Sequence, residues 1–116
     1  MAKSLKEKRK HLRRPVNILL KYKIVNKFFE DYIKNISLGG IFVETPHPLP
    51  VNTQLKVRFS LPEMKRPIET DGIVVHTIQR HATHDPKISG MGIKFSDLDR
   101  ESRTRLEEYI TSAKVF

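Results

Sequence analysis

Cysteine is absent from the 116 residues, which excludes disulfides, thiolate-bound metals and a thiol nucleophile. Long apolar runs are absent as well, since no stretch approaches the roughly 18 to 20 residues that cross a bilayer. The N-terminus is basic but lacks the apolar segment of a secretory signal. We therefore expect no membrane span and a cytoplasmic location.

The short sequence motifs of common enzymes are also missing. No Gly-x-Ser-x-Gly, His-Glu-x-x-His, phosphate-binding loop or dinucleotide fingerprint occurs. His81, His84 and Asp85 suggest a metal site, with His76 nearby, but no fourth ligand has suitable spacing. We predict no metal site, no cofactor and no enzymatic activity.

The positive charge of the chain is concentrated at its start. Residues 1–14 hold seven Lys or Arg against one Glu, a net charge of +6, so the other 102 residues carry only +3. A cationic segment of this kind either attracts phosphate groups or is simply a solvated tail. We divide the chain into a flexible basic arm, residues 1–14, and a folded domain, residues 15–116.

Apolar and polar residues alternate along most of the domain, which is typical of half-buried strands. Val16 to Ile24 is the first such stretch, and Phe28 to Ile36 returns as its hairpin partner. Gly39 and Gly40 mark a turn after it, because glycine adopts positive φ without steric cost. Further strands are predicted at 41–44, 55–61, 68–79 and 91–95.

Only the last segment has a helical period. Its apolar residues share one helical face: Leu106, Tyr109, Ile110 and Ala113. Ser96 or Asp97 is predicted to cap the start of this helix, and Asp99 favours the N-terminal end of its dipole. Six strands followed by one helix predict a mainly all-β fold, a small antiparallel barrel with a C-terminal helix.

Two short motifs carry the functional prediction. Arg9 and Arg13 form an Arg-x-x-x-Arg pair just before the first strand, and their planar guanidinium groups match phosphate oxygens or the O6 and N7 edge of guanine.

The second motif is an Asn-x-Ser-x-x-Gly sequence between the second and third strands. Asn35 and Ser37 offer hydrogen-bond donors and acceptors, while Gly40 lets a ligand or another backbone come close. Together the two motifs predict a guanine pocket on the barrel rim, with the arm folded over the phosphates.

The two motifs, in this order and at these strand boundaries, resemble the PilZ family. Arg14-Pro15-Val16, Gly39 to Val43 and Gly90 to Phe95 are similar to PilZ segments as well, so the resemblance extends from about Lys8 to Ala113. It implies a six-stranded antiparallel split β-barrel with a C-terminal α-helix. It also implies binding of cyclic di-GMP, a dianion with two guanine bases.

The resemblance also implies a role for each motif residue. Arg9 and Arg13 would hold the phosphates and one guanine edge, Asn35 and Ser37 would hydrogen-bond the other guanine, and Gly40 would keep the turn open. Secondary candidates are Lys8, Lys10, Arg14 and His76. His76 stands where some PilZ domains stack a side chain on a base. Lys8 replaces an arginine that is frequent in the family and influences stoichiometry, so one ligand or a stacked pair stays open.

We therefore predict a bacterial second-messenger receptor whose arm becomes ordered on binding and which then acts on a downstream protein. Two alternatives stay open. Asn35 and Ser37 could serve only to form a turn, which would leave a ligand-free PilZ adaptor that contacts other proteins. A small basic barrel with an arginine-rich arm also fits a nucleic acid, although the nearly neutral body argues against that partner.

Overall fold

The computed structural model of the protein describes residues 13–79 and 89–112. The predicted arm, apart from Arg13 and Arg14, lies outside the described residues. The same holds for Ala113 and for the histidine-containing segment 81–85.

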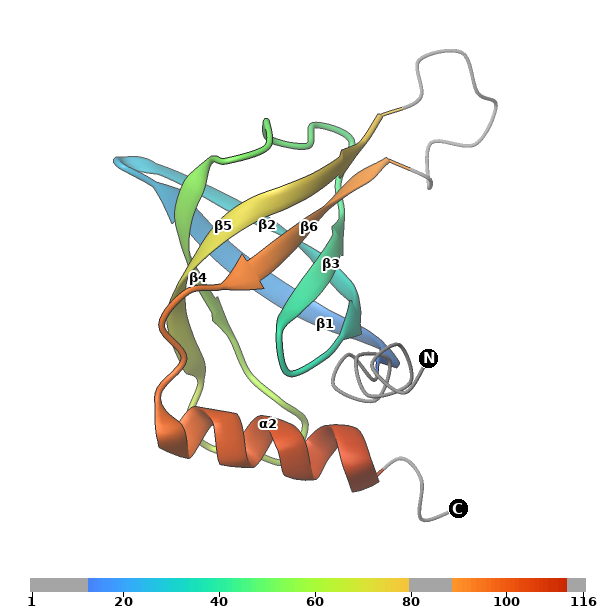
Figure 1. Cartoon of the computed structure of the whole chain (residues 1–116), viewed down its shortest axis with the longest axis vertical. Helices are drawn as coiled ribbons and strands as arrows, with labels where there is room; N and C mark the ends of the chain where they lie inside the picture. The colour runs from blue at the N-terminus through green and yellow to red at the C-terminus, as the bar shows by residue number, and fades with distance from the viewer. Residues whose placement is uncertain (1–12, 80–88, 113–116) are drawn as a thin grey trace, which may run out of the picture.

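The structure confirms the six predicted strands and the C-terminal helix. In chain order the elements are β1 (Arg14–Ile24), β2 (Lys27–Ile36), β3 (Gly40–Glu44), β4 (Gln54–Phe59), β5 (Ile68–Ile78), β6 (Gly90–Phe95) and α2 (Arg100–Ser112). The strands close into an antiparallel barrel in the order β1-β2-β3-β6-β5-β4. Helix α2 lies beneath one end of the barrel, and the turn of the β1–β2 hairpin lies toward the other end (Figure 1).

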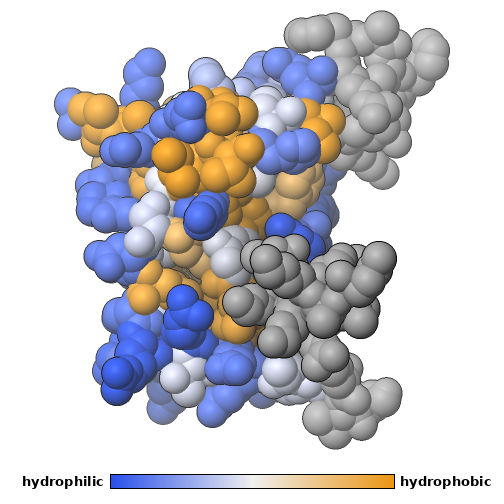
Figure 2. Space-filling view, in the orientation of Figure 1, coloured by the Kyte–Doolittle hydropathy of each residue, from blue (hydrophilic) through white to orange (hydrophobic). Residues whose placement is uncertain are grey.

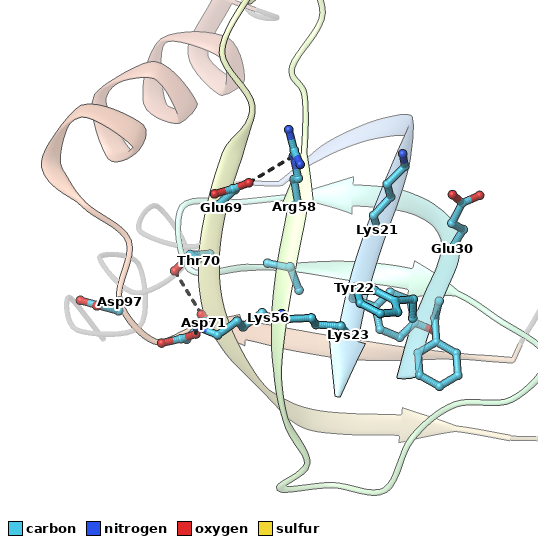
Figure 3. A pocket seen from close by; sticks show the side chains of 13 residues that line it. Lys21, Tyr22, Lys23, Glu30, Lys56, Arg58, Glu69, Thr70, Asp71 and Asp97 are labelled. Atoms are coloured by element: carbon cyan, nitrogen blue, oxygen red, sulfur yellow. Dashed lines mark hydrogen bonds and ion pairs between the residues drawn. The ribbon is translucent and has the colours of Figure 1, made fainter. Parts of the chain in front are cut away.

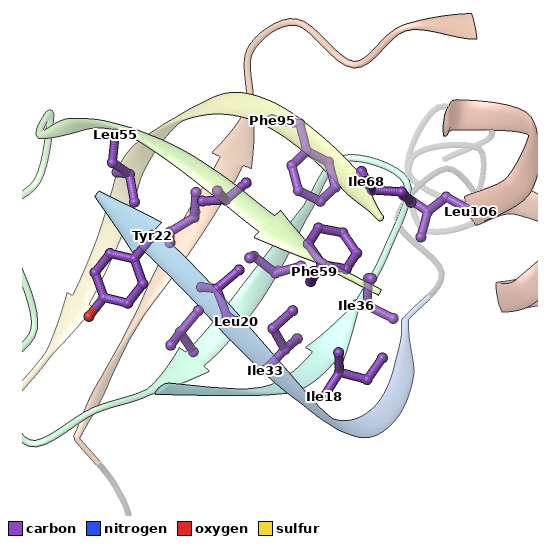
Figure 4. Packing of buried hydrophobic residues seen from close by; sticks show 14 of the residues in the cluster. Ile18, Leu20, Tyr22, Ile33, Ile36, Leu55, Phe59, Ile68, Phe95 and Leu106 are labelled. Carbon is purple, nitrogen blue, oxygen red and sulfur yellow. The ribbon is translucent and has the colours of Figure 1, made fainter. Parts of the chain in front are cut away.

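The alternation that predicts the strands also produces the core. On β1, Leu20 and Tyr22 are buried while Lys21 between them is exposed. The buried side chains of the strands meet inside the barrel, and Leu106 of α2 reaches toward them at its end (Figure 4). Removal of this apolar surface from water is the main stabilising contribution to a small barrel. The core therefore fixes which residues are left on the outer surface.

The N-terminal cap of α2 differs from the prediction. Ser96 and Asp97 do not cap the helix, because α2 begins only at Arg100 and the Ser96 N–H still donates to the Asp71 carbonyl of β5 at 2.9 Å. Asp99 is the cap: its Oδ1 accepts a hydrogen bond of 2.7 Å from the Ser102 N–H. This bond holds the pKa of the Asp99 carboxyl below its usual value, because it favours the charged form.

Replacing Asp99 by alanine should lower the melting temperature at pH 7, because the Ser102 N–H loses its acceptor. A carboxyl with a lowered pKa stabilises the fold above its unfolded pKa and stops doing so as pH falls through the folded value. The difference from wild type should therefore shrink below about pH 4. Asp97→Ala is the matched control, and a larger effect of that variant in thermal melts would contradict the assignment.

No helix within residues 13–79 and 89–112 is both long enough and apolar enough to cross a membrane.

Candidate functional site

The structure brings parts of the two sequence motifs together. Arg13 directly precedes β1, and Asn35 lies near the end of β2, in the part of the hairpin where these strands pair. The Nη1 of Arg13 donates a hydrogen bond to the Oδ1 of Asn35. Arg13 is exposed, and Asn35 is the one hydrogen-bond partner of its guanidinium among the described residues, so its other N–H groups can serve a bound molecule.

Asn35 belongs to a row of residues that crosses four neighbouring strands of the barrel. Consecutive members are paired across the strands: Asn35 with Phe42, Phe42 with Gly92, and Gly92 with His76. We call these four residues the cross-strand row. The neighbours of Phe42 and Gly92 along β3 and β6 are buried in the core: Ile41, Val43, Met91 and Ile93. The row therefore lies on the outer surface of the barrel.

Irregular pairing shapes the barrel around this row. The strand registers shift between Ile33 and Asn35 on β2 and between Val74 and His76 on β5. A third shift follows Pro15 on β1, which pairs with Asn35. Bulges of this kind change the direction of nearby side chains and occur often beside binding sites.

The middle of the row is occupied by a residue without a side chain. Among the residues that the structure describes, a Cβ on Gly92 would meet only the Cβ of His76, at 3.3 Å. His76 is exposed, and Phe42 is half-buried with its ring beside Gly90. A flat group lying over Gly92 would thus be flanked by an imidazole and a phenyl ring, and the Asn35 amide could offer it a hydrogen bond.

The Ser37 side chain is buried within a turn and does not face a binding surface. This side chain is only 1% exposed, and its hydroxyl accepts from the N–H groups of Gly39 and Gly40 at 3.2 and 3.3 Å. The turn is closed by a backbone bond of 2.9 Å from the Ser37 N–H to the Gly40 carbonyl. The Ser37 side chain therefore builds the β2–β3 connection that carries Asn35 at its edge.

Replacing Ser37 by alanine should lower the free energy of unfolding by about 1 to 3 kcal/mol, because the hydroxyl that accepts from two N–H groups of a buried turn is lost. Urea denaturation measures this difference. The exposed Ser60 supplies the matched control, since Ser60→Ala should change stability by less than about 0.5 kcal/mol. Equal midpoints for the two variants would show that the turn does not need the hydroxyl.

Gly40 lies against the backbone of β6 and does not border an open surface. A Cβ at this position would lie 2.2 Å from the carbonyl oxygen of Ile93 on β6, so only glycine allows β3 and β6 to pair here. The expectation of positive φ at the paired glycines is wrong, because no glycine in the described part of the chain has positive φ.

Arg14, a secondary candidate for a ligand contact, instead contacts helix α2. Its Nη1 donates to the Tyr109 carbonyl at 2.6 Å, and its guanidinium lies 4.0 Å from the centre of the Tyr109 ring. A positive group beside a carbonyl of the last helical turn also opposes the negative end of the helix dipole. Neighbouring arginines thus have different surroundings, with Arg13 beside Asn35 and Arg14 beside α2.

Phe42, Gly92 and Lys94 are not among the site residues predicted from the sequence. Lys94 pairs with Gly40 across β3 and β6, is exposed, and lies two residues from Gly92. The alternation Gly90-Met91-Gly92 within an apolar strand was an available signal, because strand glycines often mark a close approach. The other predicted residues of the arm, Lys8, Arg9 and Lys10, lie outside the described residues.

Among the residues that the structure describes, no group of three or more His, Asp or Glu side chains could hold a metal ion. His81, His84 and Asp85 fall outside this part of the chain.

Several solved structures share this fold. The Bacillus subtilis inhibitor of motility MotI/DgrA matches with a TM-score of 0.77 at 20% identity, over 90% of this chain and 50% of its own. The PilZ domain of YcgR from Escherichia coli, solved with c-di-GMP, matches with a TM-score of 0.69 at 16% identity. This match covers 90% of this chain and 89% of the YcgR domain. MrkH from K. pneumonia matches with a TM-score of 0.70 at 26% identity, over 90% of this chain and 49% of the MrkH chain.

The chain thus spans about half the length of MotI/DgrA and of MrkH. No curated protein matches the sequence. The model of the PilZ domain family matches residues 7–112, which is nearly the whole chain. The protein is a member of the PilZ domain family.

Proposed function

We propose that this protein is a non-enzymatic receptor for cyclic di-GMP, which binds between the N-terminal arm and the cross-strand row. The observation that carries the proposal is the hydrogen bond from Arg13 to Asn35, because it joins the first motif to the second at the surface of the barrel. Membership of the PilZ family supports the choice of ligand. So does the YcgR PilZ domain, a similar fold solved with c-di-GMP.

The chemistry of the row suits a purine nucleotide. Arg13 can turn its free N–H groups to a phosphate or to the O6 and N7 edge of a guanine. The Asn35 amide can hydrogen-bond a base that lies over Gly92, beside the exposed His76. Arg9, with Lys8 and Lys10, would add positive charge from the arm, and Lys94 would add it from β6.

The remaining motif residues act indirectly in this proposal. Ser37 holds the turn that carries Asn35, and Gly40 allows the strand pairing beside it. Arg14 is assigned to the helix and not to the ligand. The ligand contacts proposed for the described residues are therefore Arg13, Asn35, Gly92 and His76.

Binding would act as a switch in the arm. Residues 1–13, which precede β1, carry a net charge of +5, so they repel one another until a dianion neutralises part of that charge. Ligand held between the arm and the barrel would order the arm and change the surface that a downstream protein meets. The downstream protein would bind differently to the ordered arm, while the barrel keeps its shape.

Calorimetric titration with cyclic di-GMP tests the proposal directly. We expect saturable heat at micromolar protein, with an affinity that changes only modestly between low and high salt. A nucleic acid bound through many phosphates would instead weaken steeply with salt. Cyclic di-AMP is the matched control ligand, since adenine lacks the O6 acceptor that guanine offers to arginine. Absence of heat with cyclic di-GMP would refute the receptor function.

A second candidate function is a ligand-free adaptor that contacts other proteins. The observation in its favour is that Ser37 and Asn35 already have partners within the chain, in the turn and in Arg13. An adaptor would give no heat with cyclic di-GMP, and Arg13→Ala would leave its partner binding unchanged.

A further inference from the structure

The turn of the β1–β2 hairpin is exposed, apolar and conformationally costly. Ile24 pairs with Lys27, which leaves Val25 and Asn26 as a two-residue turn. Val25 has φ of 53° and is 83% exposed. A β-branched residue is rarely found at positive φ, where glycine or asparagine is usual. The barrel gains no core packing from this valine, so the fold alone gives no reason for it.

A second large apolar side chain lies beside this turn. Phe28, one residue beyond Lys27, is 76% exposed. Figure 2 shows hydrophobic residues at the hairpin end of the molecule, at the upper left, next to hydrophilic ones. We call Val25 and Phe28 the hairpin tip. An exposed apolar group at the end of a projecting hairpin is accessible to a flat surface.

Two lysines, Lys23 and Lys27, lie beside the hairpin tip. Lys23 pairs directly with Phe28 across the hairpin, with its Nζ 5.8 Å from the centre of the ring. Lys23 also pairs with Lys56 of β4, and Lys21 pairs with Arg58. Like charges placed directly opposite each other in a sheet are unfavourable unless something neutralises them.

Acidic residues lie beside several of these basic groups, and Glu30 of β2 pairs with Lys21 across the hairpin. Lys56 lies 3.0 Å from Asp71 and Arg58 lies 3.2 Å from Glu69, along the outer groove of about 880 Å³ that Figure 3 shows. Within the described ranges, the ion pairs include none made by Lys21, Lys23 or Lys27. Lys23 and Lys27, the two lysines nearest the hairpin tip, have neither an ion pair nor an acidic residue directly opposite them among the described residues.

We propose that the hairpin tip is a site for peripheral binding to an anionic lipid surface. Val25 and Phe28 would enter the boundary between headgroups and acyl chains, and Lys23 and Lys27 would meet lipid phosphates just above it. An apolar end followed by lysines is the order of side chains that a bilayer interface favours. An acidic protein partner would be attracted by the lysines but gives no reason for an exposed valine at a strained turn.

The tip and the cross-strand row lie far apart. Asn35 is in the part of β2 that pairs with the start of β1, and the tip is at the other end of this hairpin. Seven residues of β2 lead from Phe28 to Asn35, or roughly 23 Å at 3.3 Å per residue. The barrel could therefore bind a lipid surface and a nucleotide at the same time, and the lipid inference does not depend on the proposed receptor function.

Co-sedimentation of the full chain with vesicles, without nucleotide, tests the inference. We expect binding to phosphatidylcholine–phosphatidylglycerol vesicles and at least about tenfold less to phosphatidylcholine alone. The double variant Val25→Asn with Phe28→Ser should reduce binding to the anionic vesicles by about tenfold. Asparagine tolerates positive φ, so this variant should melt no earlier than wild type.

Leu19→Ser is the matched control, because Leu19 is another exposed apolar residue of β1, 40% exposed, but lies away from the turn. It should bind anionic vesicles within about twofold of wild type. If the double variant of the hairpin tip binds anionic vesicles as well as wild type does, the inference is overturned, because the basic arm alone would then account for the attraction to lipid. Loss of binding in the Leu19 variant would overturn it too.

Fluorescence gives an independent readout, because the chain has no tryptophan. Phe28→Trp should shift its emission to shorter wavelength with anionic vesicles, and Leu19→Trp should not. A shift at position 19 alone, or none at 28 while the protein binds, would contradict insertion of the tip. Failure of the wild type to bind vesicles, with a dimer that Phe28→Ser dissociates in sedimentation, would assign the tip to self-association instead.

Discussion

Replacing Arg13 by alanine should weaken cyclic di-GMP binding at least about a hundredfold, since about 3 kcal/mol is lost with a charge-assisted contact to a phosphate or guanine. The same change should leave the free energy of unfolding within about 0.5 kcal/mol of wild type, because Arg13 is exposed and bonds only to Asn35 among the described residues. Calorimetry and urea denaturation measure the two quantities.

Arg14→Ala is the matched control, and it should show the opposite result. The hydrogen bond and the ring contact to Tyr109 are lost, at a cost of about 2 kcal/mol and roughly 10 °C in melting temperature. At a temperature where this variant is folded, its affinity should stay within about threefold of wild type. Loss of binding without loss of stability in Arg14→Ala, or normal binding by Arg13→Ala, would contradict the assignment of Arg13 to the ligand and of Arg14 to the helix.

Two glycines of the site should respond in opposite ways to an added methyl group. Gly40→Ala should lower the free energy of unfolding by about 3 kcal/mol or more, because the new Cβ would lie 2.2 Å from the Ile93 carbonyl oxygen in the strand opposite. Neither β3 nor β6 can move away without breaking their pairing. Urea denaturation should show this loss as a lower midpoint.

Gly92→Ala should instead keep the fold, within about 1 kcal/mol. Its Cβ would lie 3.3 Å from the Cβ of His76, whose exposed side chain can adjust. The methyl group would occupy the space proposed for a base, so cyclic di-GMP should bind at least about tenfold more weakly in calorimetry. Unchanged affinity in a folded Gly92→Ala protein would place the ligand elsewhere on the barrel.

The strands could be predicted from the sequence because each has one buried and one exposed side. Leu55, Val57 and Phe59 are buried, and Lys56 and Arg58 between them are exposed, as their alternation indicates. The number of strands indicates a small barrel, but alternation gives no strand order, so the pairing order β1-β2-β3-β6-β5-β4 does not follow from the pattern. The family itself is shown by the match over residues 7–112.

The helix cap was harder to predict, because three residues just before the helix have capping side chains. Ser96, Asp97 and Asp99 can all accept from an N–H group. Which of them does so depends on where the chain leaves β6, and Ser96 is still bonded to Asp71 of β5. A single sequence does not contain that information, since it is set by contacts between distant segments.

The site could be predicted only in part for the same reason. The two motifs indicate Arg13 and Asn35 as site residues, and the structure places these two in contact. Arg14 is only a secondary candidate in the sequence, and its contact with α2 depends on which side of the chain an arginine takes at the start of a strand. Phe42 and Gly92 depend on pairing between β3, β6 and β5, which no local pattern reveals.

The most direct test of the central claim is a nuclear magnetic resonance titration of labelled protein with cyclic di-GMP. The Asn35 side-chain amide and the signals of Arg13, Gly92 and His76 should shift together and saturate at one ligand concentration. The signals of the hairpin tip should stay unchanged. Shifts confined to another part of the barrel, or none at saturating nucleotide, would contradict binding at the cross-strand row.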